Sequence, residues 1–177
     1  TIEAGSGNDS IYYIGALDNI YGEEGDDYFQ ATSNTFSLID GGIGFDSLTI
    51  DQVLLENGLY SIDYRNLTKG QIINIEVLNY GSEQVLGKGQ ILISGKTFSD
   101  LNTNSLIIKA TWSGGKEQGI GLEGDFKLVG FSGEYDIYTL SENGETYTIF
   151  VWKDHYVFKI DNSELEISLS NTLVAEE

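Results

Sequence analysis

The sequence predicts an all-β protein that begins with a short structural repeat and continues into non-repetitive β-structure. Two observations lead to this prediction. A nine-residue period of acidic and apolar residues runs through residues 4–49. Beyond it, short or alternating apolar runs are separated by glycine and asparagine, a pattern typical of strands. The chain has no proline, and no segment has the periodicity of a long helix.

The repeat is aligned in units of nine from Ala4. The units are AGSGNDSIY (4–12), YIGALDNIY (13–21), GEEGDDYFQ (22–30), ATSNTFSLI (31–39) and, after one inserted residue at Asp40, GGIGFDSLT (41–49). The sixth position is an acid in every unit but one: Asp9, Asp18, Asp27, Phe36 and Asp46. The eighth is always apolar: Ile11, Ile20, Phe29, Leu38 and Leu48. Such a period indicates one supersecondary unit stacked on the next.

This pattern resembles the GGxGxDxUx repeat of the repeats-in-toxin (RTX) family, most closely at GGIGFDSL, GSGNDSI and GEEGDDYF. The resemblance implies a six-residue turn and a short strand in each unit. Two units then make one coil of a right-handed parallel β-roll, with Ca²⁺ between turns that lie one coil apart. Residues 1–50 are therefore expected to form an RTX calcium-binding β-roll.

Two units per coil place the first, third and fifth turns on one edge of the roll. Glycines in these turns permit the positive φ angles that aim carbonyl groups at an ion, and Ca²⁺ takes six to eight oxygen ligands. We expect two or more ions, one between the Asp9 and Asp27 turns and one between the Asp27 and Asp46 turns. The ligands are those three carboxylates and, mainly through backbone carbonyls, Gly5, Gly7, Gly22, Glu24, Asp26, Gly41, Gly42, Ile43 and Gly44.

Some details of the ion sites stay open at this point. The side chains of Glu23, Glu24 and Asp26 either strengthen ion binding or are simply solvated. The opposite edge, with Asp18 and Phe36, lacks most of the glycines and is expected to hold no metal. A third ion beyond Asp46, against the loop near 79–82, is a further option.

Charge supports a bound cation. The formal net charge is −19, and residues 1–64 contain twelve acids but no Lys, Arg or His before Arg65. Packed carboxylates of one sign repel each other without a counter-ion. The same charge excludes nucleic acid as a partner. There is no cysteine to form a disulfide, and no apolar stretch long enough for a membrane span.

Residues 51–161 are expected to form a β-rich capping domain, because the last coil of a solenoid must be covered. A hairpin is predicted at Asn143-Gly144, a turn at 153–155 and a helical turn at 97–101. The predicted strands are 59–64, 72–78, 90–93, 105–112, 126–129, 135–140, 146–152 and 156–160.

A second resemblance concerns INIEVLNYG (73–81), SLIIKATWSGG (105–115), FKLVGFSG (126–133) and GETYTIFVWKDHYVFKID (144–161). These segments are similar to the C-terminal end of large bacterial RTX adhesins. The similarity implies a region read by a type I secretion apparatus. The acidic C-terminal tail, residues 162–177, is a candidate for the secretion signal.

No catalytic residue is predicted. His155 is the only histidine and cysteine is absent, which argues against both a Ser–His–Asp triad and a zinc site. Among the acids, no pair stands out as a glycosidase pair beyond those in the repeat. Trp112, Trp152 and the tyrosines either fill the core or form a sugar-binding platform.

The expected function is calcium-dependent folding and type I secretion at the C-terminus of a larger bacterial extracellular protein, an adhesin. The protein is expected to be secreted or on the cell surface, where the parent protein meets a host or surface ligand. The alternatives are a calcium-scaffolded glycan-binding module and the non-catalytic C-terminal domain of a secreted toxin, protease or lipase.

Overall fold

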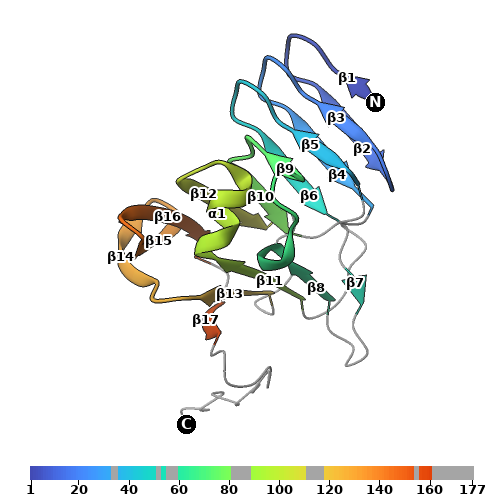
Figure 1. Ribbon diagram of the computed structural model, residues 1–177. Helices are drawn as coiled ribbons and strands as arrows, with labels where there is room; N and C mark the ends of the chain where they lie inside the picture. Colours follow the sequence, from blue (N-terminus) through green and yellow to red (C-terminus); the bar gives the residue numbers. More distant parts are fainter. Residues whose placement is uncertain are drawn as a thin grey trace.

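The computed structural model describes residues 1–32, 36–50, 53–54, 60–80, 89–110, 118–153 and 156–160. In this part of the chain the protein is all-β, with three sheets, one α-helix and one 3₁₀ turn. The N-terminal parts of two of these sheets form a narrow arm, and the third sheet belongs to the C-terminal half (Figure 1).

In the arm the chain passes back and forth between two sheets. Every strand pair in the arm is parallel, so each turn carries the chain to the other sheet. One sheet contains β1 (Ile2–Glu3), β3 (Asn19–Tyr21) and β5 (Leu38–Asp40), and the other contains β2 (Ser10–Ile14), β4 (Tyr28–Ala31) and β6 (Ser47–Ile50).

Strand register follows the predicted repeat except in two places, one of which is a bulge between Ile11 and Ile14 in the second strand. Phe29 pairs with Leu48, and both are fully buried, as the eighth positions require. In the other sheet Ile20 pairs with Ile39 and not with Leu38. Ile39 is the buried residue of the two. The extra residue of this coil therefore lies in the turn before Leu38 and not at Asp40, and Ser37 instead of Phe36 lies level with Asp18.

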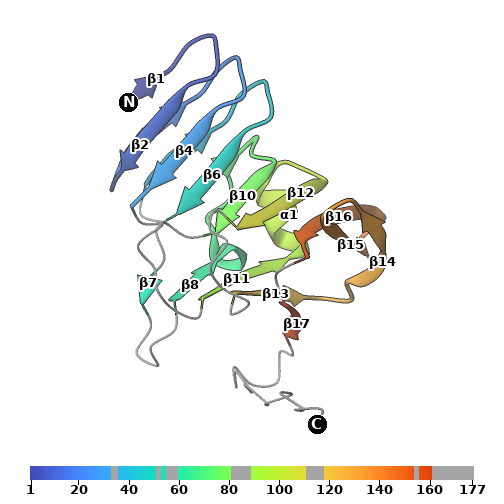
Figure 2. The same ribbon diagram turned by 180° about the vertical axis from the view of Figure 1, so that it is seen from behind.

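The arm continues directly into the C-terminal half. β9 (Ile72–Ile73) pairs with β5, and β10 (Val77–Tyr80) pairs with β6, so the chain makes a fourth coil after residue 50. The sheet that holds β6 then extends through β12 (Ser105–Ala110), β16 (Glu145–Trp152), β15 (Tyr135–Glu142) and β14 (Lys127–Ser132) (Figure 2). The two halves share one hydrophobic core, which includes Ile20 and Leu48 as well as Leu106 and Ile149.

The third sheet has parallel strands that recur at a longer interval. Ile62 pairs with Ile91, and Ile91 pairs with Ile120. The strands are β8 (Tyr60–Asp63), β11 (Gly89–Ser94), β13 (Gln118–Glu123) and β17 (Tyr156–Ile160), with β7 (Val53–Leu54) antiparallel to β8. The longer coil makes room for the 3₁₀ turn η1 (Tyr64–Asn66) and the helix α1 (Gly95–Leu101).

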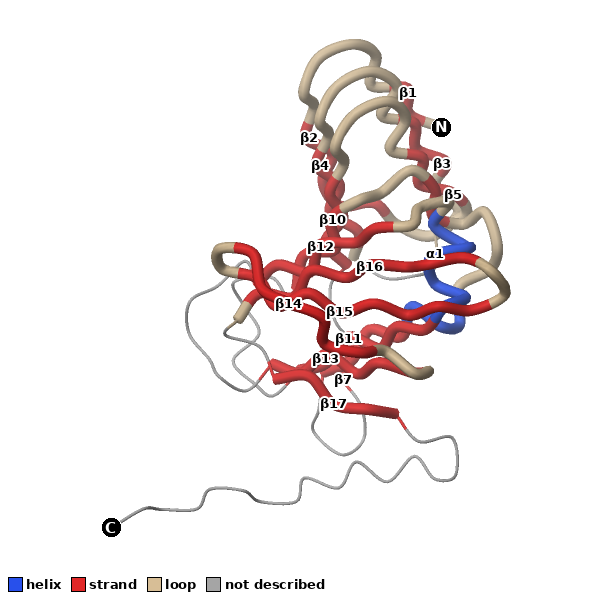
Figure 3. The backbone as a smooth tube through the Cα atoms, turned by 90° about the vertical axis from the view of Figure 1, so that its left-hand side faces the viewer, coloured by secondary structure: helices blue, strands red, loops and turns tan. Residues whose placement is uncertain are grey.

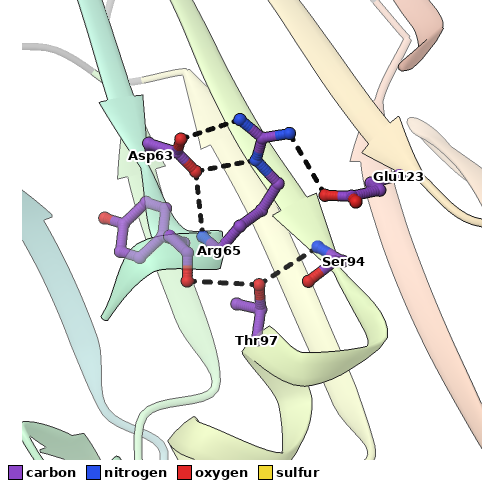
Figure 4. Close-up of polar contacts among 6 residues, drawn as sticks. Asp63, Arg65, Ser94, Thr97 and Glu123 are labelled. Carbon is purple, nitrogen blue, oxygen red and sulfur yellow. Dashed lines mark hydrogen bonds and ion pairs between the residues drawn. The ribbon is translucent and has the colours of Figure 1, made fainter. Parts of the chain in front are cut away.

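Polar contacts fix η1 and α1 against this sheet (Figure 4). Arg65 donates to both carboxylate oxygens of Asp63 at 2.8 Å and to Glu123 on β13 at 3.1 Å. Thr97 donates its hydroxyl proton to the Tyr64 carbonyl and accepts the Ser94 N–H, which orients the first turn of α1. The helix ends at Asn102, whose φ of 55° lies in the left-handed region.

Most of the strands predicted after residue 50 are confirmed, as is the helical turn at 97–101. The hairpin at Asn143-Gly144 is confirmed too, with φ angles of 55° and 85° that fit a type I′ turn. The predicted strand 72–78 was wrong in extent, because a turn at 74–76 divides it into β9 and β10. β13 was not predicted. Its Gly121 leaves room for neighbouring side chains, because a Cβ would lie 2.7 Å from Leu92 and 2.9 Å from Phe158.

Candidate metal centre

Three glycine-rich turns lie one above another along one edge of the arm, as the repeat predicts (Figure 3). They span residues 4–9, 22–27 and 41–46. Short bridges link Ser6 to Glu24 and Glu24 to Ile43. Gly7 N–H donates to the Glu24 carbonyl at 2.7 Å, and Gly25 N–H donates to the Ile43 carbonyl at 2.9 Å. The turns are thus held in register by backbone hydrogen bonds.

The glycines permit this close stacking. A Cβ at Gly25 would lie 2.2 Å from the carbonyl oxygen of Gly7, and a Cβ at Gly44 would lie 1.9 Å from that of Gly25. At the second position Gly5 and Gly42 adopt φ angles of 100° and 95°, and a Cβ at Gly42 would meet the Glu23 carbonyl. At Gly25, Gly42 and Gly44, therefore, only glycine allows a turn to approach the carbonyl groups of the turn before it.

The aspartates of the three turns form a buried ladder. Asp9 N–H donates to Asp27 Oδ1 at 2.8 Å, and Asp27 N–H donates to Asp46 Oδ1 at 2.8 Å. Asp46 N–H donates to Glu76 Oε2 at 2.9 Å, which adds a fourth carboxylate. Asp27 is 1 % exposed and Asp46 0 % exposed, while Asp9 is half-buried. Asp27, Asp46 and Glu76 therefore each use one carboxylate oxygen to accept the N–H of the residue one coil earlier.

The second oxygen of each buried aspartate is the central feature of the site. Asp27 Oδ2 and Asp46 Oδ2 are buried without a hydrogen-bond partner among the described residues. A Cβ placed on Gly22 would lie 2.3 Å from Asp27 Oδ2 and 2.3 Å from the Gly41 carbonyl oxygen. Asp27 Oδ2 and the Gly41 carbonyl oxygen therefore lie close together beside Gly22, and buried oxygens of this kind call for a donor or a cation.

The negative charge on Asp46 is destabilised by burial. Desolvation raises the pKa of Asp46 to about 6, and the Asp27 N–H bond only partly offsets the increase. The negative charges of Glu76, Asp27 and Asp26 raise it further. A cation beside the Asp46 carboxylate would favour its ionised form instead.

The donor chemistry fits Ca²⁺ better than a transition metal. The converging atoms are carboxylate and carbonyl oxygens, which hard cations prefer, and nitrogen or sulfur ligands are absent from the described turns. No group of three or more His, Cys, Asp or Glu side chains in the described part of the chain is arranged to hold a metal. The predicted site does not need such a group, because each turn gives one carboxylate and the backbone gives the rest.

Glu24 and Asp26, at two of the predicted ligand positions, do not belong to the buried carboxylate ladder. Both residues are exposed, as is Ile43 at 75 %. Asn8 Oδ1 accepts the Asp26 N–H at 3.0 Å, and Asp26 Oδ1 accepts the Phe45 N–H at 2.9 Å. These contacts form a second, exposed ladder, and the Asp26 carboxylate takes part in it.

The opposite edge has a different arrangement. Asp18 Oδ2 accepts the N–H of Gly15 within its own turn at 2.9 Å, so this carboxylate closes a local turn. Phe36 is 2 % exposed and belongs to the hydrophobic core. Residues 33–35 lie outside the described part. Among the residues described on this edge, no carboxylate accepts a backbone N–H from the turn one coil earlier, as Asp27 and Asp46 do on the other edge.

Two residues at the end of the ladder, Asn74 and Glu76, were not predicted as part of the site. Of the loop near 79–82 considered for a third ion, Asn79 and Tyr80 belong to β10, and residues 81 and 82 lie outside the described part. The sequence does contain a signal for Glu76. It precedes buried Leu78 by two positions, as Asp46 precedes Leu48. The 30-residue spacing between the two acids hides the match from a nine-residue alignment.

A separate cavity of about 510 Å³ lies beside α1, far from the glycine turns in sequence. It is lined by Lys96, Ser99, Glu123, Glu142, Asn143 and Tyr147, among others. Glu123 is ion-paired with Arg65 (Figure 4). Tyr147 stacks on Phe98 with ring centroids 4.9 Å apart. Of the residues considered for catalysis or sugar binding, His155 and Trp112 lie outside the described part.

Comparisons with protein-family models, curated proteins and solved structures give no match for this chain. In the described ranges, no helix has the length and apolar character needed to cross a membrane.

Proposed function

We propose that residues 1–50 form a right-handed parallel β-roll that binds Ca²⁺ along its glycine-rich edge, and that calcium drives its folding. The observation that carries the proposal is the pair of buried oxygens, Asp27 Oδ2 and Asp46 Oδ2, that lack a hydrogen-bond partner in the described structure. Each lies close to a backbone carbonyl oxygen, Asp27 Oδ2 to that of Gly41 and Asp46 Oδ2 to that of Asn74. A divalent cation bound beside each of these oxygens would satisfy it and offset the negative charge of the ladder.

The energetic argument follows from burial. An ionised carboxylate without a partner is costly in the interior, so the metal-free turns are destabilised at neutral pH. Ca²⁺ that binds only the folded turns adds its binding free energy to folding. The arm would then be weakly folded without calcium and stable with it.

This coupling suits export, and we propose that the chain is the C-terminal module of a larger extracellular protein, an adhesin, secreted by a type I apparatus. Extracellular calcium modules typically have a Kd of about 10⁻⁴–10⁻³ M, far above cytoplasmic free calcium. The arm would stay unfolded inside the cell and fold outside, which opposes return through the exporter. Residues 162–177 are proposed as part of the secretion signal, and no enzymatic role is proposed.

The test is a calcium titration of the chain after removal of metal with EGTA, followed by circular dichroism. Calcium should increase the β signal and the resistance to urea, while equal magnesium should have a much smaller effect. Asp27→Asn keeps an oxygen for the Asp9 amide but removes the charge, and should weaken the response. A spectrum in EGTA identical to that in calcium would overturn the proposal.

One observation favours a second function, a glycan-binding module. The cavity beside α1 combines an aromatic ring, Tyr147, with the amide of Asn143 and the carboxylate of Glu142, and sugar sites commonly pair an apolar surface with a few polar groups. Binding of the calcium-loaded chain to a glycan array, lost in Asn143→Gly and Glu142→Gln, would support this function. Asn143→Gly preserves the positive φ that the turn requires. No binding to any glycan would exclude it.

A further inference from the structure

The short turn at 74–76 repeats the contact geometry of the glycine-rich turns. A Cβ on Gly41 would lie 2.0 Å from the Asn74 carbonyl oxygen and 2.6 Å from Asp46 Oδ2. One coil earlier, a Cβ on Gly22 has the same relation to the Gly41 carbonyl and Asp27 Oδ2. The Asn74 carbonyl therefore stands where a glycine carbonyl stands in the repeat, although this turn contains no glycine.

Asn74 is held in place by the C-terminal half. Its φ is 55°, a left-handed conformation that asparagine tolerates. Its N–H donates to the Leu101 carbonyl at the end of α1 at 3.1 Å. Its side chain donates to Asp40 Oδ1 at 2.8 Å and accepts from Asn102. These contacts fix the direction of the Asn74 carbonyl without any help from an ion.

Glu76 provides the acid of this turn. Its Oε2 accepts the Asp46 N–H at 2.9 Å, as each repeat aspartate does for the coil before it. Its own N–H donates to the Asp46 carbonyl at 3.1 Å, so the two turns are joined in both directions. Asp46 Oδ2, on a residue that is 0 % exposed, lies between these turns with no hydrogen-bond partner in the described structure.

We infer that a further divalent-cation site of the calcium class lies between the turns 41–46 and 74–76, with Asp46 Oδ2 and the Asn74 carbonyl as ligands and Glu76 as the neighbouring charge. The inference rests on the proposed calcium function and extends it. The other two sites have glycine-rich turns on both sides. This one has the arm on one side and the C-terminal half on the other, so an ion here would link the two.

The experiment is calcium binding to the full chain by isothermal titration calorimetry. The three pairs of adjacent turns should give three ions in the wild-type chain. Glu76→Gln retains an acceptor for the Asp46 amide but removes the charge, and should weaken one ion by at least about tenfold, as loss of a supporting group commonly does. The other two ions should be unchanged. Glu134→Gln, at an exposed position, is the matched control and should bind three ions.

Hydrogen exchange of the wild-type chain gives a reading that does not depend on the variant. Calcium should slow exchange at the Glu76 and Val77 amides, which donate to the Asp46 carbonyl, as well as in the glycine turns. Protection of the glycine turns alone, or Glu76→Gln binding calcium like wild type, would overturn this inference and leave the proposed function standing. Absence of calcium binding to the wild-type chain would overturn both.

Discussion

The amide of Asp46 donates a 2.9 Å hydrogen bond to the carboxylate of Glu76, and this bond joins the repeat to the turn that follows it. The two residues are separated by 30 positions, because η1 and the strands β7 and β8 intervene. The bond continues the contacts that Asp9 makes to Asp27 and Asp27 to Asp46. The carboxylate ladder thus continues from the arm into the C-terminal half without interruption.

The aspartates should differ in their importance for calcium-dependent folding. Asp27→Ala should raise the calcium midpoint more than Asp9→Ala, because it removes a ligand and leaves the Asp9 amide without its acceptor. Asp18→Ala should have the smallest effect on the midpoint, since Asp18 bonds only within its own turn. Circular dichroism during a calcium titration measures all three midpoints. A larger shift for Asp18→Ala than for Asp27→Ala would show that the ions bind the other edge.

The metal-free chain should lose stability as the pH rises from about 4 to about 6. The pKa of Asp46 is raised from 3.8 to about 6 in the folded chain, so the folded state holds a proton in this window that the unfolded state has released. The loss attributable to Asp46 is at most about 3 kcal/mol. Urea unfolding in EGTA at several pH values measures it.

Asp46→Asn is the control for this pH effect, because it cannot ionise and its amide oxygen can still accept the Asp27 N–H. The difference in unfolding free energy between wild type and variant should change across the same window. Saturating calcium should abolish the wild-type decrease, since the ion favours the charged form. An unchanged difference from pH 4 to 7 would contradict the prediction.

The stacking glycines should be intolerant of alanine. Gly44→Ala places a Cβ 1.9 Å from the Gly25 carbonyl oxygen and must separate the turns. We expect a loss of about 2–4 kcal/mol in the unfolding free energy in calcium, together with weaker calcium binding. Gly130→Ala on β14 is the control, because nothing lies within 4 Å of its Cβ. Equal stabilities of the two variants would show that the turns are not closely stacked.

Arg65 should be more important than a surface cation. It bonds Asp63 through two nitrogens and Glu123 through a third, with 14 % of its side chain exposed. Arg65→Lys loses the planar pairing and should cost about 1–2 kcal/mol in thermal or urea unfolding. Lys127→Ala breaks an exposed pair with Asp125 and should change stability by less than about 0.5 kcal/mol. A larger loss of stability in Lys127→Ala than in Arg65→Lys would contradict the conclusion that Arg65 holds β8 and β13 together.

The repeat could be predicted from sequence because period and residue type coincide there. Phe29 and Leu48 are buried at the expected positions, and the glycine turns of Asp9, Asp27 and Asp46 stack as expected. The period failed where one extra residue entered a turn, since Leu38 and Ile39 are equally apolar and only the pairing with Ile20 distinguishes them. Glu76 was missed because the chain returns to the ladder only after a long excursion. β13 was missed because its Gly121 makes room for the side chains of Leu92 and Phe158, a fit that no local pattern reveals.

The buried ladder has a polarity. Each amide depends on an acceptor that comes later in the chain, so loss of Glu76 leaves the Asp46 amide unsatisfied, whereas loss of the Asp9 side chain removes no acceptor from the rungs between Asp9 and Glu76. Truncation from the two ends is therefore not equivalent. At the amino-terminal end other contacts would be lost instead, because Asn8 Oδ1 accepts the Asp26 N–H and the Gly5 carbonyl accepts the Glu24 N–H. The carboxylate ladder is thus anchored at its Glu76 end, in the C-terminal half of the chain.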